Sequence, residues 1–180
     1  PLLDLKVAFA RQSENYRFPS DKDFLESLQN SDLYELRVCK FILDGLENTG
    51  TKEPANTSTY TIEHIMPQNE NLSREWQEML GDDWQAVQSK WLHRIGNLTL
   101  TGYNATYSDR SFEDKKSIEG GFNQSSIRLN QYVRDQVQWS ESEINIRNSQ
   151  LAQRCSKIWS DLKVEQKHID AAKLRELTET

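Results

Sequence analysis

The sequence has no long hydrophobic run. No stretch of about 18 apolar residues occurs in its 180 positions, which excludes a transmembrane helix. No basic-then-apolar leader opens the chain, so nothing in it predicts export. The first residue is Pro1 and not Met, and we expect the chain to be cut from a longer protein.

Cysteine is also scarce. Cys39 and Cys155 both fall inside helical patterns and form no CxxC pair. That spacing argues against a disulfide framework and against a zinc ribbon. We therefore expect a reducing, cytoplasmic setting.

Positive charge is in deficit. The chain carries 22 Lys and Arg against 28 Asp and Glu, a net charge of −6. This balance argues against binding nucleic acid by bulk electrostatics. It leaves room for a nuclease that uses metal ions and a few local cations. Apolar residues make up only 36%, but five Trp, six Tyr and six Phe supply a core, so the chain is not disordered.

Helical patterns occupy the first 50 residues. Ser20 with Asp23 three positions later resembles a capping box. Ser31 or Asp32 then opens a stronger helix whose apolar residues recur at spacings of three and four through Leu46.

The last 60 residues are helical again. Ser140 with Glu143 predicts the cap of the longest helix, whose apolar stripe runs from Ile144 to Leu162. The tail from Val164 is charged and is expected to be helical or frayed.

Between these helical parts the pattern changes to short strands. Residues 58–62 and 97–101 are rich in β-branched and apolar side chains and predict two strands. Helices around 76–80 and 83–92 separate them, and a short helix follows from 104 to 116. Strand, excursion, strand and helix is the order of a ββα unit.

His64 is the most informative residue. It follows the first predicted strand, comes directly after Glu63, and can accept a proton from water because a neutral imidazole has a pKa near ~6.5. The backbone turns at a strand end, so Glu63 and His64 could serve a metal and a water respectively. The alternative, more common for a lone histidine, is a side chain that only hydrogen-bonds a loop.

Two asparagines strengthen the case. Asn is disfavoured in strands, so its presence as Asn97 at the head of the second strand suggests a specific role. One such role is to hold the loop that carries His64 by hydrogen bonds. Asn104 offers a neutral oxygen suited to Mg²⁺. The alternatives are an ordinary turn Asn and an ordinary N-cap Asn.

The combination resembles one family closely. The segments TIEHIMPQ at 61–68, HRIGNLTLT at 93–101 and SFEDKK at 111–116, with Asn104 between the last two, resemble a His-Me finger (HNH) nuclease domain. This is the domain at the C-terminus of GmrSD-type modification-dependent restriction enzymes and of related Ssp phosphorothioate-linked anti-phage defence effectors. The resemblance covers residues 33–160.

The resemblance implies a role for each motif residue. His64 would be the general base, Glu63 a metal ligand, Asn97 the residue that orients the ββα loop, and Asn104 the second protein ligand. Asp109 and Asn123 are the alternatives to Asn104. The implied cofactor is Mg²⁺ or Mn²⁺, with no zinc.

Further residues around the motif could contact phosphate. His93 could touch the scissile phosphate or a metal, but a helix-capping or packing role is favoured. Four cationic side chains form a local basic island suited to phosphate contacts: Arg94, Arg110, Lys115 and Lys116. An equally favoured alternative is that they belong to a solvated helix face.

We therefore expect a mainly α fold with an embedded ββα-metal motif. Residues 1–50 would form a helical segment, 51–120 the nuclease core and 121–180 helices packed on it, as one compact domain. The expected activity is metal-dependent nicking of DNA within a restriction or anti-phage defence protein. No nucleotide-binding motif is present, so sensing and NTPase functions are expected of an upstream domain. The alternative is a non-catalytic helical DNA-binding or partner-binding module with a degenerate finger, favoured by the acidic pI.

Overall fold

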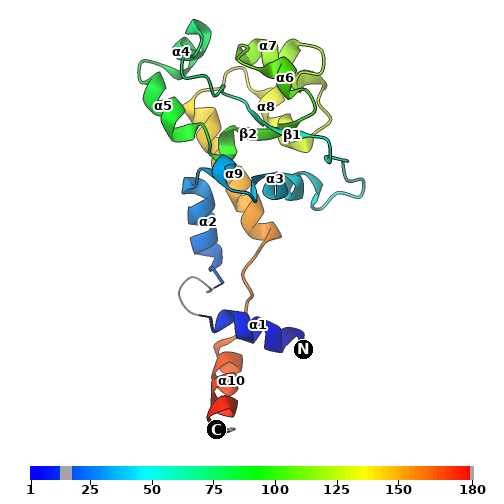
Figure 1. The fold of residues 1–180 in the computed structure, drawn as a ribbon, viewed down its shortest axis with the longest axis vertical. Helices are drawn as coiled ribbons and strands as arrows, with labels where there is room; N and C mark the ends of the chain where they lie inside the picture. The colour runs from blue at the N-terminus through cyan, green and yellow to red at the C-terminus, as the bar shows by residue number, and fades with distance from the viewer. Residues whose placement is uncertain (13–17, 179–180) are drawn as a thin grey trace.

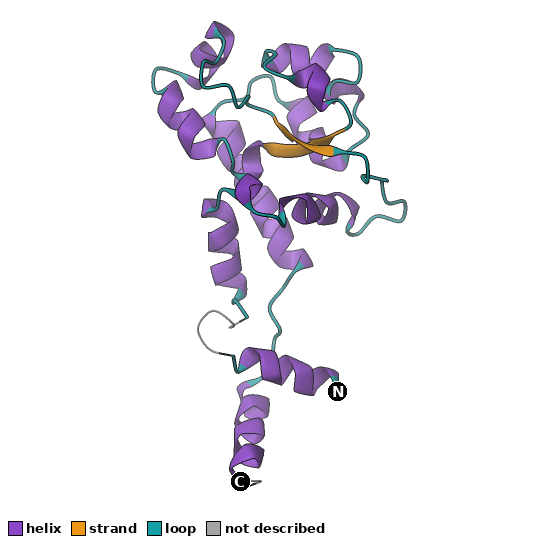
Figure 2. Ribbon diagram, in the orientation of Figure 1, coloured by secondary structure: helices purple, strands orange, loops and turns teal. Residues whose placement is uncertain are grey.

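A computed structural model describes residues 1–12 and 18–178. The described part is mainly helical and contains a two-stranded antiparallel sheet (Figures 1 and 2). This bears out the predicted mainly helical fold with a small antiparallel two-stranded sheet. The elements in chain order are α1 (Leu2–Ala10), α2 (Asp21–Asn30), η2 (Leu33–Glu35), α3 (Cys39–Asn48), β1 (Thr61–His64), α4 (Arg74–Leu80), α5 (Trp84–Trp91), η3 (Ile95–Asn97), β2 (Leu98–Thr101), α6 (Asn104–Tyr107), α7 (Phe112–Ser117), η4 (Phe122–Gln124), η5 (Arg128–Asn130), α8 (Gln131–Asp135), α9 (Glu141–Ile158) and α10 (Gln166–Thr178).

Both predicted capping boxes are present. The Ser20 hydroxyl accepts from the Asp23 amide at 3.1 Å, and the Asp23 carboxylate accepts from the Ser20 amide at 3.4 Å. Ser140 and Glu143 make the same reciprocal arrangement at the start of α9. These local signals fix where α2 and α9 begin.

The first strand lies later in the chain than its composition suggested. The prediction of a strand over 58–62 is wrong at its start, because a turn in which the Tyr60 amide donates to the Thr57 carbonyl occupies those residues. β1 pairs antiparallel with β2, from Thr61 opposite Thr101 to His64 opposite Leu98. His64 is thus the last residue of the strand, where the backbone leaves the sheet.

The helix predicted from Ser31 or Asp32 is interrupted. A 3₁₀ turn, η2, is followed by an extended residue, Leu36, which is exposed, and α3 begins only afterwards. The Tyr34 amide donates to the His93 carbonyl at 3.3 Å. That long-range bond holds η2 beside the segment before β2 and competes with continuous helix.

The segment after β2 forms two helices where one was predicted. α6 ends at Tyr107 and is followed by Ser108, which has a φ of 42°, and Ser111 caps α7 by accepting from the Asp114 amide at 3.2 Å. After the break, Lys115 of α7 reaches the end of β1, where it bonds Glu63 and the His64 carbonyl.

α9 is the scaffold behind the sheet. Its Arg147 is buried and donates to the carbonyls of Ile95, Gly96 and Leu98, which fixes the entry into β2. The helix ends at Ile158, so the predicted stripe is too long by its last member, Leu162.

Two apolar clusters pack around the sheet. One joins α3, β2 and α9, and the other joins α4, α5, α7 and α8. Trp76, Phe112 and Trp139 are fully buried in the second cluster. α1 and α10 contact each other and lie together at one end of the molecule, away from the sheet (Figure 1). Among the described residues, no helix has both the length and the apolar character to cross a membrane.

Candidate active site

The His64 side chain lies in a small cluster of aromatic rings. It is only 4% exposed, and its Nε2 lies 3.2 Å from Nδ1 of His93. The Tyr34 ring meets it edge-on with the centroids 4.5 Å apart. The end of β1, the loop between α5 and η3, and the 3₁₀ turn η2 therefore converge on one imidazole.

The environment keeps this imidazole neutral. Burial lowers the pKa of His64 to about 3, and the nearby charges of His93 and Lys115 act in the same direction. The ring is therefore uncharged at physiological pH and keeps a free lone pair, but a general base is most effective with a pKa near the working pH, so burial also weakens His64 as a base.

His93 follows α5 and packs against both partners. Its ring stacks on Tyr34 with 5.3 Å between centroids and 11° between planes. Its Nε2 lies 3.7 Å from Oε1 of Glu35. The packing role favoured from the sequence is present, but the side chain also faces His64. Sequence reasoning missed Tyr34 and Glu35, because they lie far upstream and no spacing links them to the motif.

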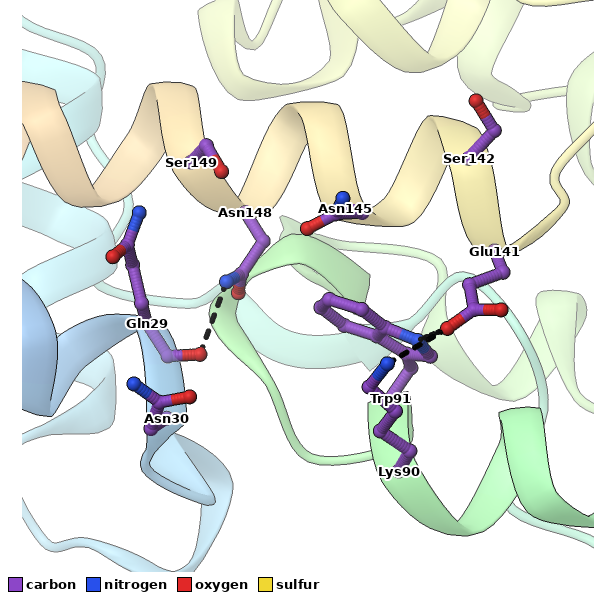
Figure 3. A pocket seen from close by; sticks show the side chains of 9 residues that line it. All are labelled: Gln29, Asn30, Lys90, Trp91, Glu141, Ser142, Asn145, Asn148 and Ser149. Carbon is purple, nitrogen blue, oxygen red and sulfur yellow. Dashed lines mark hydrogen bonds and ion pairs between the residues drawn. The ribbon is translucent and has the colours of Figure 1, made fainter.

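The helix that delivers His93 is tied to α9 through one carboxylate. Glu141 accepts from Nζ of Lys90 at 2.9 Å and from the indole nitrogen of Trp91 at 2.8 Å. Figure 3 shows these contacts beside a polar hollow lined by residues of α2, α5 and α9. The predicted catalytic and metal-binding residues do not line this hollow, so we assign it no part in the chemistry.

Asn97 makes four hydrogen bonds from a fully buried side chain. Its Oδ1 accepts from the Met66 amide at 2.8 Å and from the Trp139 indole at 3.2 Å. Its Nδ2 donates to the carbonyls of Met66 and Leu92, each at 3.1 Å. The predicted contact with the loop after His64 is confirmed, and it joins that loop to the end of α5.

Glu63 points away from His64 and pairs with a lysine. Its Oε1 accepts from Nζ of Lys115 at 2.6 Å, and the same Nζ donates to the His64 carbonyl at 2.9 Å. Burial raises the pKa of Glu63 to about 7, against the lowering effect of Lys115, and Asp109 adds to the rise. Lys115 is fully buried, so its predicted place in a surface phosphate-binding island is wrong. Its ammonium is already held by the carboxylate and the carbonyl.

The predicted second ligand, Asn104, lies at the start of α6 and is exposed. Its Nδ2 donates to the Ile62 carbonyl at 3.1 Å, which places it beside β1. Of the alternatives, Asp109 accepts from the side-chain Nδ2 of Asn69 at 2.9 Å and is close enough to Glu63 to affect its pKa. Asn123 is exposed in η4. Among the described residues, no group of three or more His, Cys, Asp and Glu side chains is placed to hold a metal ion.

Of the other predicted phosphate contacts, Arg94 and Arg110 lie in loops and Lys116 lies in α7, and all three donate to backbone carbonyls. Nε of Arg94 donates to the Lys90 carbonyl at 3.1 Å and lies 3.5 Å from Asp32. Nε of Arg110 donates to the Thr106 carbonyl, and Nζ of Lys116 to the Gln136 carbonyl. These bonds engage part of each side chain within the fold.

The chain was also compared with known proteins. A direct comparison with curated proteins finds no match. The model of one family, GmrSD restriction endonucleases, C-terminal domain, matches residues 18–154, which is more than half of the chain and includes both strands, His64 and His93. The chain therefore belongs to the GmrSD restriction endonuclease family, of which it carries the C-terminal domain.

Proposed function

We propose that this chain hydrolyses DNA phosphodiester bonds with His64 as the general base. The observation that carries the proposal is the geometry: His64 ends β1 in contact with His93, and Asn97 fixes the loop that follows it. His64 takes a proton from water, the resulting hydroxide attacks phosphorus, and the bond from phosphorus to the 3′ oxygen breaks. The leaving oxygen takes its proton from solvent.

Asn97 acts by position and does not touch the substrate. Its four bonds hold the backbone on both sides of the histidine pair, so the ring of His64 keeps one orientation. An amide suits this task because it donates and accepts at once.

Glu63 and Asn104, with Asp109 as the alternative to Asn104, are the proposed ligands of a divalent cation. The donor chemistry fits, because carboxylate and amide oxygens are what Mg²⁺ and Mn²⁺ prefer. Lys115 against Glu63 marks the carboxylate as a position where positive charge is stabilised. When bound, a divalent cation would stabilise negative charge on the phosphate and on the leaving oxygen. Lys115 would then have to release its bond to Glu63.

One such site cuts one strand, so nicking is the elementary event. The residues named here face the sugar-phosphate backbone and supply no base readout. We propose that a longer protein provides modification sensing and NTP-dependent control through an upstream domain, in the cytoplasm, as part of anti-phage defence.

A second candidate is a non-catalytic module that binds DNA or a partner domain. Two observations favour it: His64 is 4% exposed, and Glu63 is already neutralised by Lys115. The arrangement of Asn97 favours catalysis, because a binding module has no need to fix the loop beside a neutral histidine.

A plasmid-nicking assay separates the two candidates. The chain is incubated with supercoiled plasmid and Mg²⁺ or Mn²⁺, and the open-circular product is followed over time. We expect cleavage that stops with excess EDTA and falls about 10²–10⁴-fold in His64→Ala. His168→Ala, on α10, is the matched control and should cleave as the wild type does. Absence of metal-dependent nicking by the folded wild-type chain would refute the proposed function.

A further inference from the structure

Three side chains, Glu35, His93 and His64, lie one after another in space from the surface to the proposed base. Glu35 Oε1 lies 3.7 Å from Nε2 of His93, and Nδ1 of His93 lies 3.2 Å from Nε2 of His64. Glu35 is exposed, His93 is partly exposed and His64 is buried. One nitrogen of His93 is therefore in hydrogen-bond contact with the buried imidazole, and the other lies near an exposed carboxylate.

The carboxylate favours a proton on one nitrogen of His93 through its charge, since at 3.7 Å it lies beyond hydrogen-bond distance. A neutral imidazole has one N–H and one acceptor nitrogen. The negative charge of Glu35 favours the proton on the nearer nitrogen, Nε2, and leaves Nδ1 as the acceptor. The contact at 3.2 Å then requires His64 to donate from its own Nε2.

The free lone pair of His64 is consequently on Nδ1. Within the described chain Nδ1 of His64 makes no hydrogen bond. It does not belong to the polar atoms that are both unpaired and completely shielded by the protein. The atom is therefore not fully enclosed, although the residue as a whole is only 4% exposed. A water molecule can reach the nitrogen that His93 leaves basic.

We propose that His93 is a positioning residue that holds His64 in the Nε2–H tautomer and so presents Nδ1 to the attacking water. This inference rests on the proposed nuclease function and names the atom that takes the proton. Tyr34 supports the arrangement by stacking on His93 and meeting His64 edge-on, which fixes the angle between the two imidazoles.

A purely structural role for His93 would make a different prediction. Stacking on Tyr34 requires only a flat ring, which phenylalanine also supplies. Accepting a hydrogen bond from His64 requires a lone pair, which glutamine supplies through its amide oxygen and phenylalanine lacks. His93→Phe and His93→Gln therefore separate packing from tautomer control.

The tautomer is measured directly by long-range ¹H–¹⁵N NMR on the histidine-labelled chain at neutral pH. The chain has three histidines, and His64→Ala and His168→Phe variants assign their signals. In the wild type we expect the His64 proton on Nε2 and an unprotonated Nδ1. His93→Gln should keep this pattern, and His93→Phe should lose it. A wild-type His64 with its proton on Nδ1 would overturn the inference even if the chain nicks DNA.

Kinetics provide the second readout. In single-site nicking, His93→Phe should lower kcat on the order of 10–100-fold with KM little changed, the range seen when the partner that orients a functional histidine is removed. His93→Gln should recover most of that loss. Equal rates for His93→Phe and the wild type would overturn the inference and leave the function standing, whereas full activity in His64→Ala would refute the function itself.

Discussion

Replacing Asn97 with alanine removes the side chain that joins the loop after His64 to the rest of the site. Four buried groups lose their partner: the amide and carbonyl of Met66, the carbonyl of Leu92 and the indole N–H of Trp139. At about 1 kcal/mol net for each bond, the free energy of unfolding should fall by about 4 kcal/mol. The free energy of unfolding of a typical domain is roughly 5–15 kcal/mol, so this loss is a large fraction of it.

The assay is urea unfolding followed by tryptophan fluorescence, combined with hydrogen exchange at the Met66 amide. Exchange at this amide should accelerate more than exchange elsewhere, because the loop loses its main anchor. Nicking, measured in the cold where the variant stays folded, should also fall, since His64 is then free to reorient.

Asn130→Ala is the matched control. Asn130 is equally buried and bonds Thr99, Leu100 and Ser125 on the far side of β2. It should destabilise the chain by about 3 kcal/mol but leave nicking by the folded protein intact. A loss below about 1.5 kcal/mol in Asn97→Ala, with Met66 exchange unchanged, would refute the reasoning.

Three further predictions follow from single contacts. Lys115→Met should lower the free energy of unfolding in urea titrations by about 3–5 kcal/mol, because it leaves the Glu63 carboxylate buried without its partner. Adding Glu63→Gln should recover much of the loss. An unchanged urea midpoint in Lys115→Met would contradict the pairing. Gly96→Ala should cost about 1–3 kcal/mol by the same measurement, because a methyl group there overlaps the Ile144 carbonyl of α9; a neutral effect would contradict that close approach. Burial lowers the pKa of His64 to about 3, so below pH 6.5 the unfolded chain binds a proton that the folded chain does not bind. Thermal unfolding between pH 6.5 and pH 3 should therefore show a loss of stability of up to about 1.4 kcal/mol for each pH unit of acidification. His64→Phe should show a shallower slope over the same range, and equal slopes would contradict the burial of a neutral ring.

The parts of the fold that the sequence predicted well depend on neighbours along the chain. The capping boxes at Ser20 and Ser140 involve residues three positions apart, and both are present. The bond from Asn97 to the loop after His64 was also predicted, because an asparagine at the head of a strand has few uses other than holding backbone.

The remaining errors come from contacts between distant segments. Tyr34 was assigned to a helix, but its bond to the His93 carbonyl across 59 positions stabilises a 3₁₀ turn instead. Lys115 looked like a surface cation because its segment is charged, yet its partner, Glu63, lies 52 positions away. Nothing in local composition reveals which charged residue will be buried when its partner is that remote.

Chemical rescue tests the central claim, that His64 supplies the base, most directly. In His64→Ala the space left by the imidazole ring borders Tyr34 and His93. A small heterocycle can bind there by packing against these two rings. Nicking by this variant is measured with and without added imidazole at fixed Mg²⁺. The account predicts a rate about 10²–10⁴-fold below wild type that rises with imidazole concentration, whereas a rate close to wild type without imidazole would contradict it.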